Sequence, residues 1–280
     1  MTYRVRPAAW RVLAALVPAV ALLAGSATIA TAQRAGKGPL PATVDAVYRI
    51  SFTALGDIGH FHFNSQVNGD TYALVADGKI DTTIFDYRGD MKSRGSVIAT
   101  GTGTQPADYT YNYKQKTFLK KKKLKNVNIA FNGPAVASVT PPENLSAPYV
   151  LVTPQHLKSV LDPLSGVMAL SMGNLANPCA QKLPIYDGKQ RFDLVFTPKG
   201  RAGADHVCDV KLVPVSGHKP GGGAGSVVNG NIELVMRPVP NANVVIPYKV
   251  TVPTIVGTAE LTSERVDITM PDQQRIALRR

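Results

Sequence analysis

From Val47 onward, apolar and polar side chains alternate at every second position, and this period of two most constrains the fold. In the stretch VYRISFTAL, the side chains of Tyr48, Ile50 and Phe52 fall on one face of an extended strand and polar ones on the other. GHFHFNSQV and TYALVADG repeat this pattern, and the turn sequences ALGDIG, NGD and ADGK separate the runs. The pattern predicts an antiparallel meander with one buried face and one wet face.

The alternation continues for about a hundred residues and resumes after residue 183. A flat sheet of that length would leave long edges open to pairing with other chains. We therefore predict a mainly β fold, in which the antiparallel meander forms a curved sheet or a partly open barrel.

Residues 153–173 break the alternation and show apolar residues at helical spacing instead. Thr153 is suited to the N-cap position, with Pro154 as the first helical residue. Pro163 should kink the helix or break it in two, and it disfavours helical geometry at Asp162. We predict one kinked helix over about 154–173, packed on the concave side of the sheet.

The N-terminal stretch has the pattern of an export signal. Three arginines precede an apolar run over residues 12–24, and Ala30-Thr31-Ala32 then offers a cleavage site. The run is shorter than the roughly 20 apolar residues that span a bilayer. We predict a signal peptide over residues 1–32, cleaved near Ala32, and keep an uncleaved N-terminal anchor as the alternative.

The rest of the chain contains no further apolar run long enough for a membrane-spanning helix. A Gly- and Pro-containing linker covers residues 33–44, and residues 45–280 are predicted to form a single β-rich domain. With the signal peptide, this predicts a secreted protein.

The chain carries a formal net charge of +12, and its most basic stretch is LKKKKLK. In an exported protein such charge points to anionic lipid, lipopolysaccharide phosphates or an acidic protein, and we exclude nucleic acid as a partner. A basic surface kept for solubility is the alternative. Tyrosines at positions 109, 111 and 113 just upstream suggest a basic and aromatic surface. A solvated strand edge that blocks pairing is the alternative. The residues predicted to contact an anionic membrane surface are Lys120, Lys121, Lys122, Lys123 and Lys125.

Cys179 and Cys208 are the only two cysteines. An even count in an exported chain favours one disulfide. Neither cysteine has the local partner that a zinc site or a C-x-x-C redox pair would need. The bridge would stabilise the fold by roughly 3 kcal/mol, mainly by constraining the unfolded chain.

The sequence holds no G-x-S-x-G, H-E-x-x-H or G-x-x-x-x-G-K-[ST] pattern. His60 and His62 share a strand face at a spacing that could begin a metal site, but no third ligand lies near them in the sequence. We therefore predict no catalytic residues, no metal and no cofactor, and keep an uncharacterised hydrolase as the least favoured alternative.

LPIYDGKQRFDLVF, residues 183–196, reads as a β-hairpin in which Asp187-Gly188 forms the tight turn. The predicted core side chains are Ile185, Phe192, Leu194 and Phe196. The predicted outward side chains are Lys189, Arg191 and Asp193.

The order of these segments resembles the exported proteobacterial proteins of domain-of-unknown-function family 3108. That family has an Asp-Pro-Leu-Ser segment, a first Cys, a D-G-x-x-R-x-D hairpin and a second Cys that opens a C-x-V-x-x-x-P-x-x-G strand. Here these fall on Asp162 to Ser165, Cys179, Asp187 to Asp193 and Cys208 to Gly217, and GTAELT resembles the closing strand of the family. The residues assigned a structural role by the resemblance are Asp162, Pro163, Asp187, Gly188, Arg191 and Asp193.

The resemblance carries over no catalytic residues, because the family has no agreed activity. It implies a periplasmic protein and strengthens the case for the disulfide. We expect a non-enzymatic protein of the cell envelope that binds a lipid, a lipoprotein acyl chain or a partner peptide on its curved sheet. A structural module that binds envelope proteins without a small ligand is the alternative, and the oligomeric state stays open.

Overall fold

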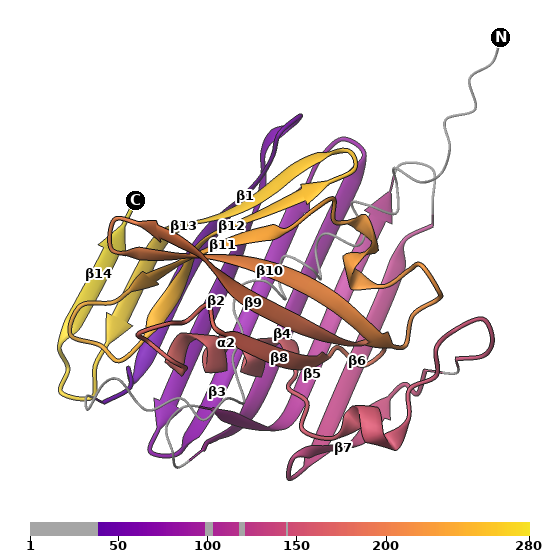
Figure 1. Cartoon of the computed structure of the whole chain (residues 1–280), viewed down its shortest axis with the longest axis horizontal. Helices are drawn as coiled ribbons and strands as arrows, with labels where there is room; N and C mark the ends of the chain where they lie inside the picture. The colour runs from indigo at the N-terminus through magenta and orange to yellow at the C-terminus, as the bar shows by residue number, and fades with distance from the viewer. Residues whose placement is uncertain (1–38, 99–102, 118–120, 144) are drawn as a thin grey trace.

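The computed structural model describes residues 39–98, 103–117, 121–143 and 145–280, so the predicted signal peptide lies outside the described residues. The described chain forms one sheet of fourteen strands with one α-helix and two 3-10 helices (Figure 1). The helical elements are η1 (Pro154–Leu157), α2 (Pro163–Met172) and η2 (Ala224–Val227). The strands are β1 (Thr43–Phe52), β2 (Gly56–Asn68), β3 (Thr71–Asp81), β4 (Phe85–Val97), β5 (Thr104–Thr117), β6 (Lys123–Asn132), β7 (Ala135–Thr140), β8 (Gln181–Tyr186), β9 (Arg191–Ala202), β10 (Asp205–Ser216), β11 (Ile232–Pro238), β12 (Val245–Thr254), β13 (Gly257–Thr269) and β14 (Arg275–Arg279).

The strand order confirms the predicted meander. The order is β7-β6-β5-β4-β3-β2-β1-β13-β12-β11-β10-β9-β8, and every neighbouring pair is antiparallel. Only the β1–β13 pair joins strands that are distant in sequence, and it runs from Thr43 opposite Thr269 to Phe52 opposite Ala259. The other edge of β13 is shared, since its first half pairs with β12 and its second half with β14.

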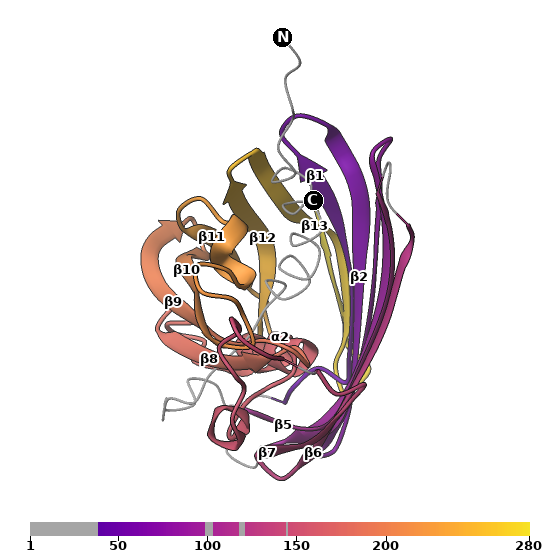
Figure 2. The same cartoon turned by 90° about the vertical axis from the view of Figure 1, so that its right-hand side faces the viewer.

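The sheet curves back on itself, so that β1–β7 form a first wall and β8–β12 a second wall (Figure 2). Helix α2 lies between the walls and contacts β3, β4 and β5 on one side and β8 and β12 on the other. The alternation in the sequence explains which face of each strand turns inward. Tyr48, Ile50 and Phe52 are buried, as predicted, while the alternate residues of β1 lie on the outer face.

The predicted kinked helix is two separate elements. The 3-10 helix η1 begins at Pro154 and ends at Leu157, and α2 begins only at Pro163. Pro163 occupies the first position of α2, where its missing N–H is not needed, and Asp162 is the extended N-cap residue. Pro163 therefore starts a new helix and does not bend an existing one.

Strands β7 and β8 end the sheet, so the barrel is not closed. The segment 158–161 lies between these two edges. Lys158 forms an antiparallel bridge with Ala135 at the start of β7, and Leu161 forms a parallel bridge with Ile185 of β8. One short extended segment thus contacts both open edges and brings the chain directly into the start of α2.

Candidate functional site

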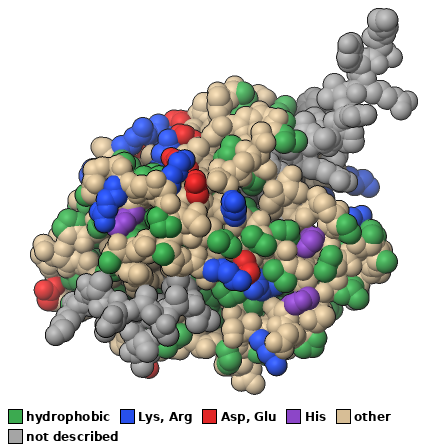
Figure 3. All heavy atoms as spheres, in the orientation of Figure 1, with side chains coloured by type: hydrophobic (Ala, Val, Ile, Leu, Met, Phe, Trp, Pro, Cys, Tyr) green, Lys and Arg blue, Asp and Glu red, His purple; other side chains and the backbone are tan. Residues whose placement is uncertain are grey.

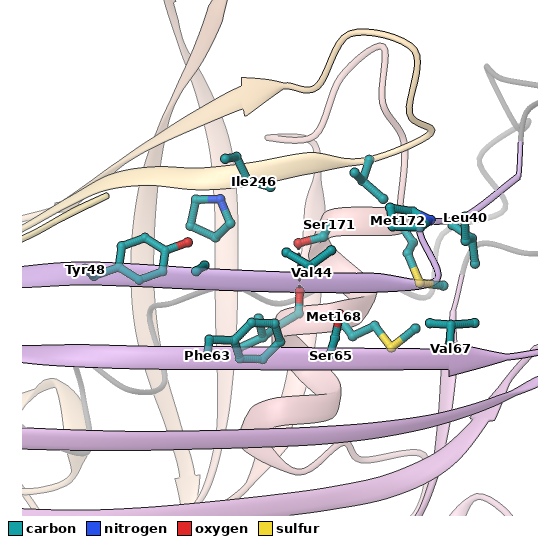
Figure 4. A pocket seen from close by; sticks show the side chains of 15 residues that line it. Leu40, Val44, Tyr48, Phe63, Ser65, Val67, Met168, Ser171, Met172 and Ile246 are labelled. Atoms are coloured by element: carbon teal, nitrogen blue, oxygen red, sulfur yellow. Dashed lines mark hydrogen bonds between the residues drawn. The ribbon is translucent and has the colours of Figure 1, made fainter. Parts of the chain in front are cut away.

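An apolar pocket opens beside the C-terminal half of α2, between the first wall and β12 (Figure 4). Met168 and Met172 of α2 line the pocket together with Phe63 of β2, and Ile246 of β12 lines the side nearest the second wall. Leu40, which precedes β1, lies next to Met172 at one end of the pocket. The side chains of β1 and β2 that line it come from the inward-facing set of the period-two pattern.

The pocket has a volume of about 50 Å³. One water needs about 10–15 Å³ of such space, so there is room for roughly three to five water-sized or methylene-sized groups. Methionine side chains are unbranched and polarisable and adapt to differently shaped neighbours. The pocket therefore suits the end of a flexible apolar chain, and Met168 and Met172 can move to admit more of it.

Three hydroxyl groups line this otherwise apolar space, those of Tyr48, Ser65 and Ser171. Tyr48 and Ser65 are both more than nine-tenths buried, and neither side chain has a hydrogen-bond partner in the described part of the chain. Burial raises the pKa of the Tyr48 phenol above its usual value of 10, so this group stays a neutral donor. The third hydroxyl, that of Ser171, donates to Val167 O at 3.2 Å within α2. Tyr48 and Ser65 are therefore available to a polar atom of a bound ligand.

The other end of α2 carries a buried cluster of polar groups, which we name the polar clamp: Asp162, Ser165, Ser93, Tyr72 and Thr104. Asp162 Oδ1 accepts the backbone N–H groups of Leu164 and Ser165 at 2.9 and 3.0 Å. Its Oδ2 accepts the hydroxyls of Ser93 and Ser165 at 2.9 and 2.5 Å.

The clamp ties α2 to three strands of the first wall. Tyr72 Oη of β3 lies 2.7 Å from Ser165 Oγ, and Ser93 Oγ of β4 lies 2.9 Å from it. Thr104 of β5 donates to the Ser165 carbonyl at 3.0 Å. The Asp-Pro-Leu-Ser segment thus has a physical role, because its Asp caps α2 and its Ser joins the cap to the sheet.

Burial raises the pKa of Asp162 from 3.8 to about 6, although the hydrogen bonds from Ser165 and Ser93 oppose the shift. Burial and the nearby Asp162 carboxylate raise the pKa of Tyr72. All five clamp side chains are buried and make hydrogen bonds to one another or to the backbone of α2. The arrangement positions the helix, and it leaves no clamp hydroxyl facing the pocket.

The Asp187-Gly188 hairpin crosses the interior and reaches the first wall. Asp187 Oδ1 accepts the backbone N–H groups of Lys189 and Gln190 at 2.8 and 2.6 Å, which forms the turn. Gly188 has φ +92°, and a Cβ there would lie 2.3 Å from Val127 Cγ1 of β6. Burial raises the pKa of Asp187. The turn needs glycine both for its φ and for the close approach to β6.

Gly217, the last residue of the family segment Cys208 to Gly217, lies against the same turn. Its φ is +80°, and a Cβ would lie 1.9 Å from Lys189 O. Its N–H donates to Val150 O at 2.7 Å. The family segments Asp187 to Asp193 and Cys208 to Gly217 therefore pack on each other, although Gly188 and Gly217 are 29 positions apart.

The prediction that Arg191 and Asp193 point outward is wrong. Both side chains are largely buried, and Arg191 Nη2 lies 2.6 Å from Asp193 Oδ1. Lys182 Nζ also lies 2.8 Å from Asp193 Oδ2. The predicted core side chains Ile185, Phe192, Leu194 and Phe196 are all buried. Strand β9 is enclosed on both faces at this point, so an alternating pattern misplaced its charged residues.

The lysine run divides into free and paired residues. Lys120 lies outside the described residues, and Lys121, Lys122 and Lys123 are exposed. Lys125 is partly buried and donates to Glu143 Oε1 at 2.6 Å.

Glu143 accepts a second lysine from the hairpin turn, since Lys189 Nζ lies 3.1 Å from Glu143 Oε2. The two lysines hold the pKa of Glu143 below its usual value despite its burial. Lys125 is thus part of an ion cluster that links β6 to the hairpin turn.

The predicted basic and aromatic surface does not form. The inner face of β5 carries Tyr109, Tyr111 and Tyr113 at alternate positions, with polar residues between them on the outer face. Tyr109 is fully buried. Tyr111 Oη lies 2.6 Å from Tyr87 Oη. The alternation that turns one set of β5 residues inward places the tyrosines in the core.

His60 and His62 both lie on the outer face of β2. His62 Nε2 lies 2.7 Å from Asp45 Oδ2, and its Nδ1 lies 3.3 Å from Asp77 Oδ1. These carboxylates raise the pKa of His62 against the opposing effect of burial. Within the described ranges, no group of three His, Cys, Asp or Glu side chains could hold a metal ion.

Ser216 and Lys219 match the S-x-x-K spacing of some serine hydrolases, a match that the sequence reading passed over. Lys219 Nζ lies over the Tyr149 ring at 5.3 Å, and Ser216 ends strand β10 and does not begin a helix. The two side chains share no hydrogen bond, so this pair offers no activated nucleophile.

The structure contains the Cys179–Cys208 disulfide, and both cysteines are buried. Cys179 precedes the edge strand β8, and Cys208 lies in β10, so the bridge passes over β9. It therefore fixes the edge of the second wall to its interior strands. Among the described helices, none is long and apolar enough to cross a membrane.

On the face that carries β8–β10, basic side chains lie beside acidic ones and apolar ones are scattered between them (Figure 3). Lys199 illustrates the pairing, because its Nζ lies 2.7 Å from Glu233 Oε2 and 3.6 Å from Asp209 Oδ1. This face shows no concentrated patch of one charge.

Comparison with known proteins matches a family model and solved structures. The model of a family described as a protein of unknown function, DUF3108, matches residues 47–263, which include the clamp, both cysteines and the hairpin. A crystal structure of a β-barrel-like protein of domain of unknown function DUF1849 from Brucella abortus is 14% identical, with a TM-score of 0.44. That likeness covers 82% of this chain and 99% of the other. No curated protein matches this sequence.

Proposed function

We propose that this chain, which belongs to the DUF3108 family of proteins of unknown function, is a non-enzymatic binding protein of the cell envelope. In this proposal the apolar pocket receives the end of an acyl chain, from a lipid or from a lipoprotein. The protein thereby supports maintenance of the envelope.

The observation that carries the proposal is an unfilled apolar space beside α2. Protein interiors leave few voids larger than a water molecule, because each void forfeits dispersion contacts. Here the space persists beside Met168 and Met172, two side chains that adapt to different shapes. Tyr48 and Ser65 add two hydroxyls that lack partners in the described part of the chain. These hydroxyls suit the carbonyl or ester oxygen of a lipid.

Two further observations support a location in the periplasm. The N-terminal sequence has the pattern of a signal peptide. The Cys179–Cys208 disulfide belongs to an oxidising compartment.

The test is to fill the pocket and measure ligand binding. Ser171 lines the pocket from α2, so Ser171→Phe places a ring in the space, and Ser171→Ala is the matched control. We expect the wild type and Ser171→Ala to carry lipid after purification from periplasm, as seen by native mass spectrometry. We also expect both to bind added palmitate, and Ser171→Phe to lose at least nine-tenths of this binding.

Circular dichroism and the melting temperature of each variant show whether the fold is intact. Equal lipid content in a folded Ser171→Phe protein would refute binding in this pocket. Absence of palmitate binding by the wild type would refute the acyl-chain proposal itself.

One observation favours the alternative of a protein-interaction module. The β1–β2 and β12–β13 turns lie side by side, since Thr53 N donates to Thr258 O at 3.0 Å. They expose Leu55 at 46% and Ile255 at 60%. If Leu55→Ser with Ile255→Ser abolished recovery of a crosslinked envelope protein while palmitate binding stayed intact, this alternative would be favoured.

A further inference from the structure

The outer face of the first wall carries a row of basic residues that the lysine run in the sequence does not reveal. In the strand register, Arg49 of β1 lies opposite His60 of β2, and His60 lies opposite Lys79 of β3. Lys79 lies opposite Arg88 of β4, which lies opposite Lys114 of β5. We name this row of five the basic ladder. Neighbouring strands are about 4.8 Å apart, so the ladder is roughly 19 Å long.

The basic ladder is an arrangement that is unfavourable for the stability of the sheet. Like charges directly opposite each other on neighbouring strands destabilise a sheet. The next row toward the middle of the strands repeats the segregation with the other sign, because Asp77 lies opposite Asp90. Charges on this wall are therefore sorted into rows, whereas on the face that carries β8–β10 they are mixed.

The two ends of the ladder differ in their acidic partners. Arg49 pairs with Asp57 and Glu264 at 3.0 and 3.1 Å. In the middle of the ladder, Lys79 Nζ lies 2.9 Å from Asp81 Oδ2 and Arg88 Nε lies 3.8 Å from Asp86 Oδ1, so these three cations have acidic partners. Lys114 has no carboxylate within ion-pair distance in the described ranges. Its neighbour is instead Lys122, whose pKa the Lys114 charge lowers. The β5–β6 end of the ladder thus holds cations that face each other without an acid between them.

The ladder lies in a hollow and not on a flat face. His60, Lys79, Arg88 and Lys114 line one open groove of about 840 Å³. The groove runs across the strands, and Asp77 and Asp90 line it beside the basic residues. The ladder is accessible in it, because the Arg88 side chain is 60% exposed.

A row of amides follows the ladder along one side of the same groove. Asn112 Nδ2 donates to Asp90 Oδ2 at 2.8 Å, and Asn126 donates to Asn112 Oδ1. Asn128 in turn donates to Asn126 Oδ1 at 2.7 Å. Amides and carboxylates fixed by one another in this way offer their remaining donors and acceptors to hydroxyl groups.

We infer that this groove binds an extended anionic polysaccharide, which lies across β2–β6 with its carboxylate or phosphate groups over the basic ladder. Lys114 and Lys122 supply cations without an acidic partner at the β5–β6 end, and the ion-paired Lys79 and Arg88 continue the row across the sheet, which suits a linear polyanion. The amide row suits the hydroxyls of the sugar units, and the recessed floor suits a single chain better than a planar membrane. The site is separate from the apolar pocket, which opens on the inner face.

The test compares charge removal inside and outside the groove. Lys114→Gln with Lys122→Gln removes two exposed and uncompensated cations. Lys211→Gln with Arg275→Gln removes the same charge from exposed positions in β10 and β14. The probe is hexagalacturonate, followed by isothermal titration calorimetry at low and at 0.5 M salt, with neutral cellohexaose as the ligand control.

We expect the wild type to bind hexagalacturonate, with an affinity that falls as salt rises, and to bind cellohexaose at least tenfold more weakly. The groove variant should lose at least tenfold in affinity, and the control variant less than twofold. Arg88→Gln should weaken binding by a similar factor, which provides a second groove variant if the first fails to fold.

Equal losses in the groove and control variants would overturn the inference, because binding would then follow net charge alone. Absence of hexagalacturonate binding by the wild type would overturn it too. In that case, flotation with vesicles of one part phosphatidylglycerol to three parts phosphatidylcholine would identify a membrane as the partner, if the groove variant lost flotation. Palmitate binding is unaffected by either result, so this test fails separately from the pocket proposal.

Discussion

The two ends of α2 lie in the same interior but differ in how they are held: the first by hydrogen bonds, the second beside an apolar space. At its N-terminus, Asp162 and Ser165 are held by hydrogen bonds from three strands of the first wall. At its C-terminus, Met168 and Met172 line a space that no side chain fills. One end of a ten-residue helix is fully specified and the other is left adaptable.

The difference indicates where a ligand can be accommodated without loss of the fold. Removing a partner from a dry hydrogen-bonded cluster leaves unsatisfied polar groups, which are costly. Displacing methionine side chains at an apolar surface costs far less. The clamp can therefore anchor α2 while the other end of the helix adjusts to an occupant. Each prediction below tests this contrast.

The largest expected effect is that of Asp162→Ala. The change removes the acceptor for two backbone N–H groups and two serine hydroxyls in a dry site, so we expect a loss of about 3–4 kcal/mol of unfolding free energy. Urea denaturation at pH 5 measures it. Asp162→Asn keeps an N-cap acceptor and should lose about 1–2 kcal/mol less. A loss below about 1 kcal/mol in the alanine variant would mean that the clamp does not anchor the helix.

The second prediction concerns pH. The folded-state pKa of Asp162, about 6, lies above the model value of 3.8. Below pH 3.8 the carboxyl is protonated in both states, and its contribution to stability is complete. As pH rises towards 6, the unfolded chain releases this proton while the folded chain retains it, so stability falls. Above pH 6 the loss from this group reaches about 3 kcal/mol.

The measurement is the difference in unfolding free energy between the wild type and Asp162→Asn at pH values from 4 to 7. The asparagine variant lacks this titration but keeps the others, so the difference isolates Asp162. We expect the wild type to lose stability relative to the variant as pH rises. A difference that stays constant over this range would show that Asp162 titrates normally.

The third prediction compares one serine at each end. The Ser165 hydroxyl donates to Asp162 Oδ2 in the clamp and lies 2.7 Å from Tyr72 Oη, and Ser165→Ala should cost about 2 kcal/mol. Ser65 lines the pocket with no partner among the described residues, and Ser65→Ala should change stability by less than about 0.5 kcal/mol. Thermal and urea unfolding of both variants under one set of conditions provides the comparison. Equal costs would remove the distinction between the two ends.

The smallest expected effect is that of Met168→Leu. The substitution keeps the volume but adds a branch, and the neighbouring space can absorb the change of shape, so we expect less than about 1 kcal/mol. Urea denaturation measures it against Leu164→Ala at the clamped end, where a fully buried side chain should cost about 3 kcal/mol. A loss above about 1.5 kcal/mol for Met168→Leu would mean that the pocket end is as tightly packed as the clamp.

Much of the fold could be predicted from local patterns. Alternation identified the inward faces of β1, β2 and β3, because side chains of a strand necessarily point to opposite faces in turn. Pro163 marked the boundary of α2 for a similar local reason, since proline lacks the N–H that an internal helical position needs. Asp187-Gly188 predicted the hairpin, because these residue types readily adopt the positive φ that a tight turn requires.

The site was less accessible to this reasoning. Arg191 and Asp193 alternate as outward residues should, yet they are buried, because β9 is covered on both faces. The clamp joins Asp162 to Ser93 and Tyr72, residues whose sequence neighbours give no sign of the contact. The basic ladder takes one residue from each of five strands, so no stretch of sequence shows it.

The sequence by itself determined the strands, their inward faces, an interruption of the helix at Pro163 and the pair of cysteines, because these depend on residues close together in the chain or on a simple count. Tertiary structure alone decided that α2 lies between two walls, that an apolar space remains beside Met168, and that five basic side chains line up across β1–β5. These features depend on strand register and on the curvature that brings distant strands together. Both are set by packing over the whole sheet and not by any local pattern.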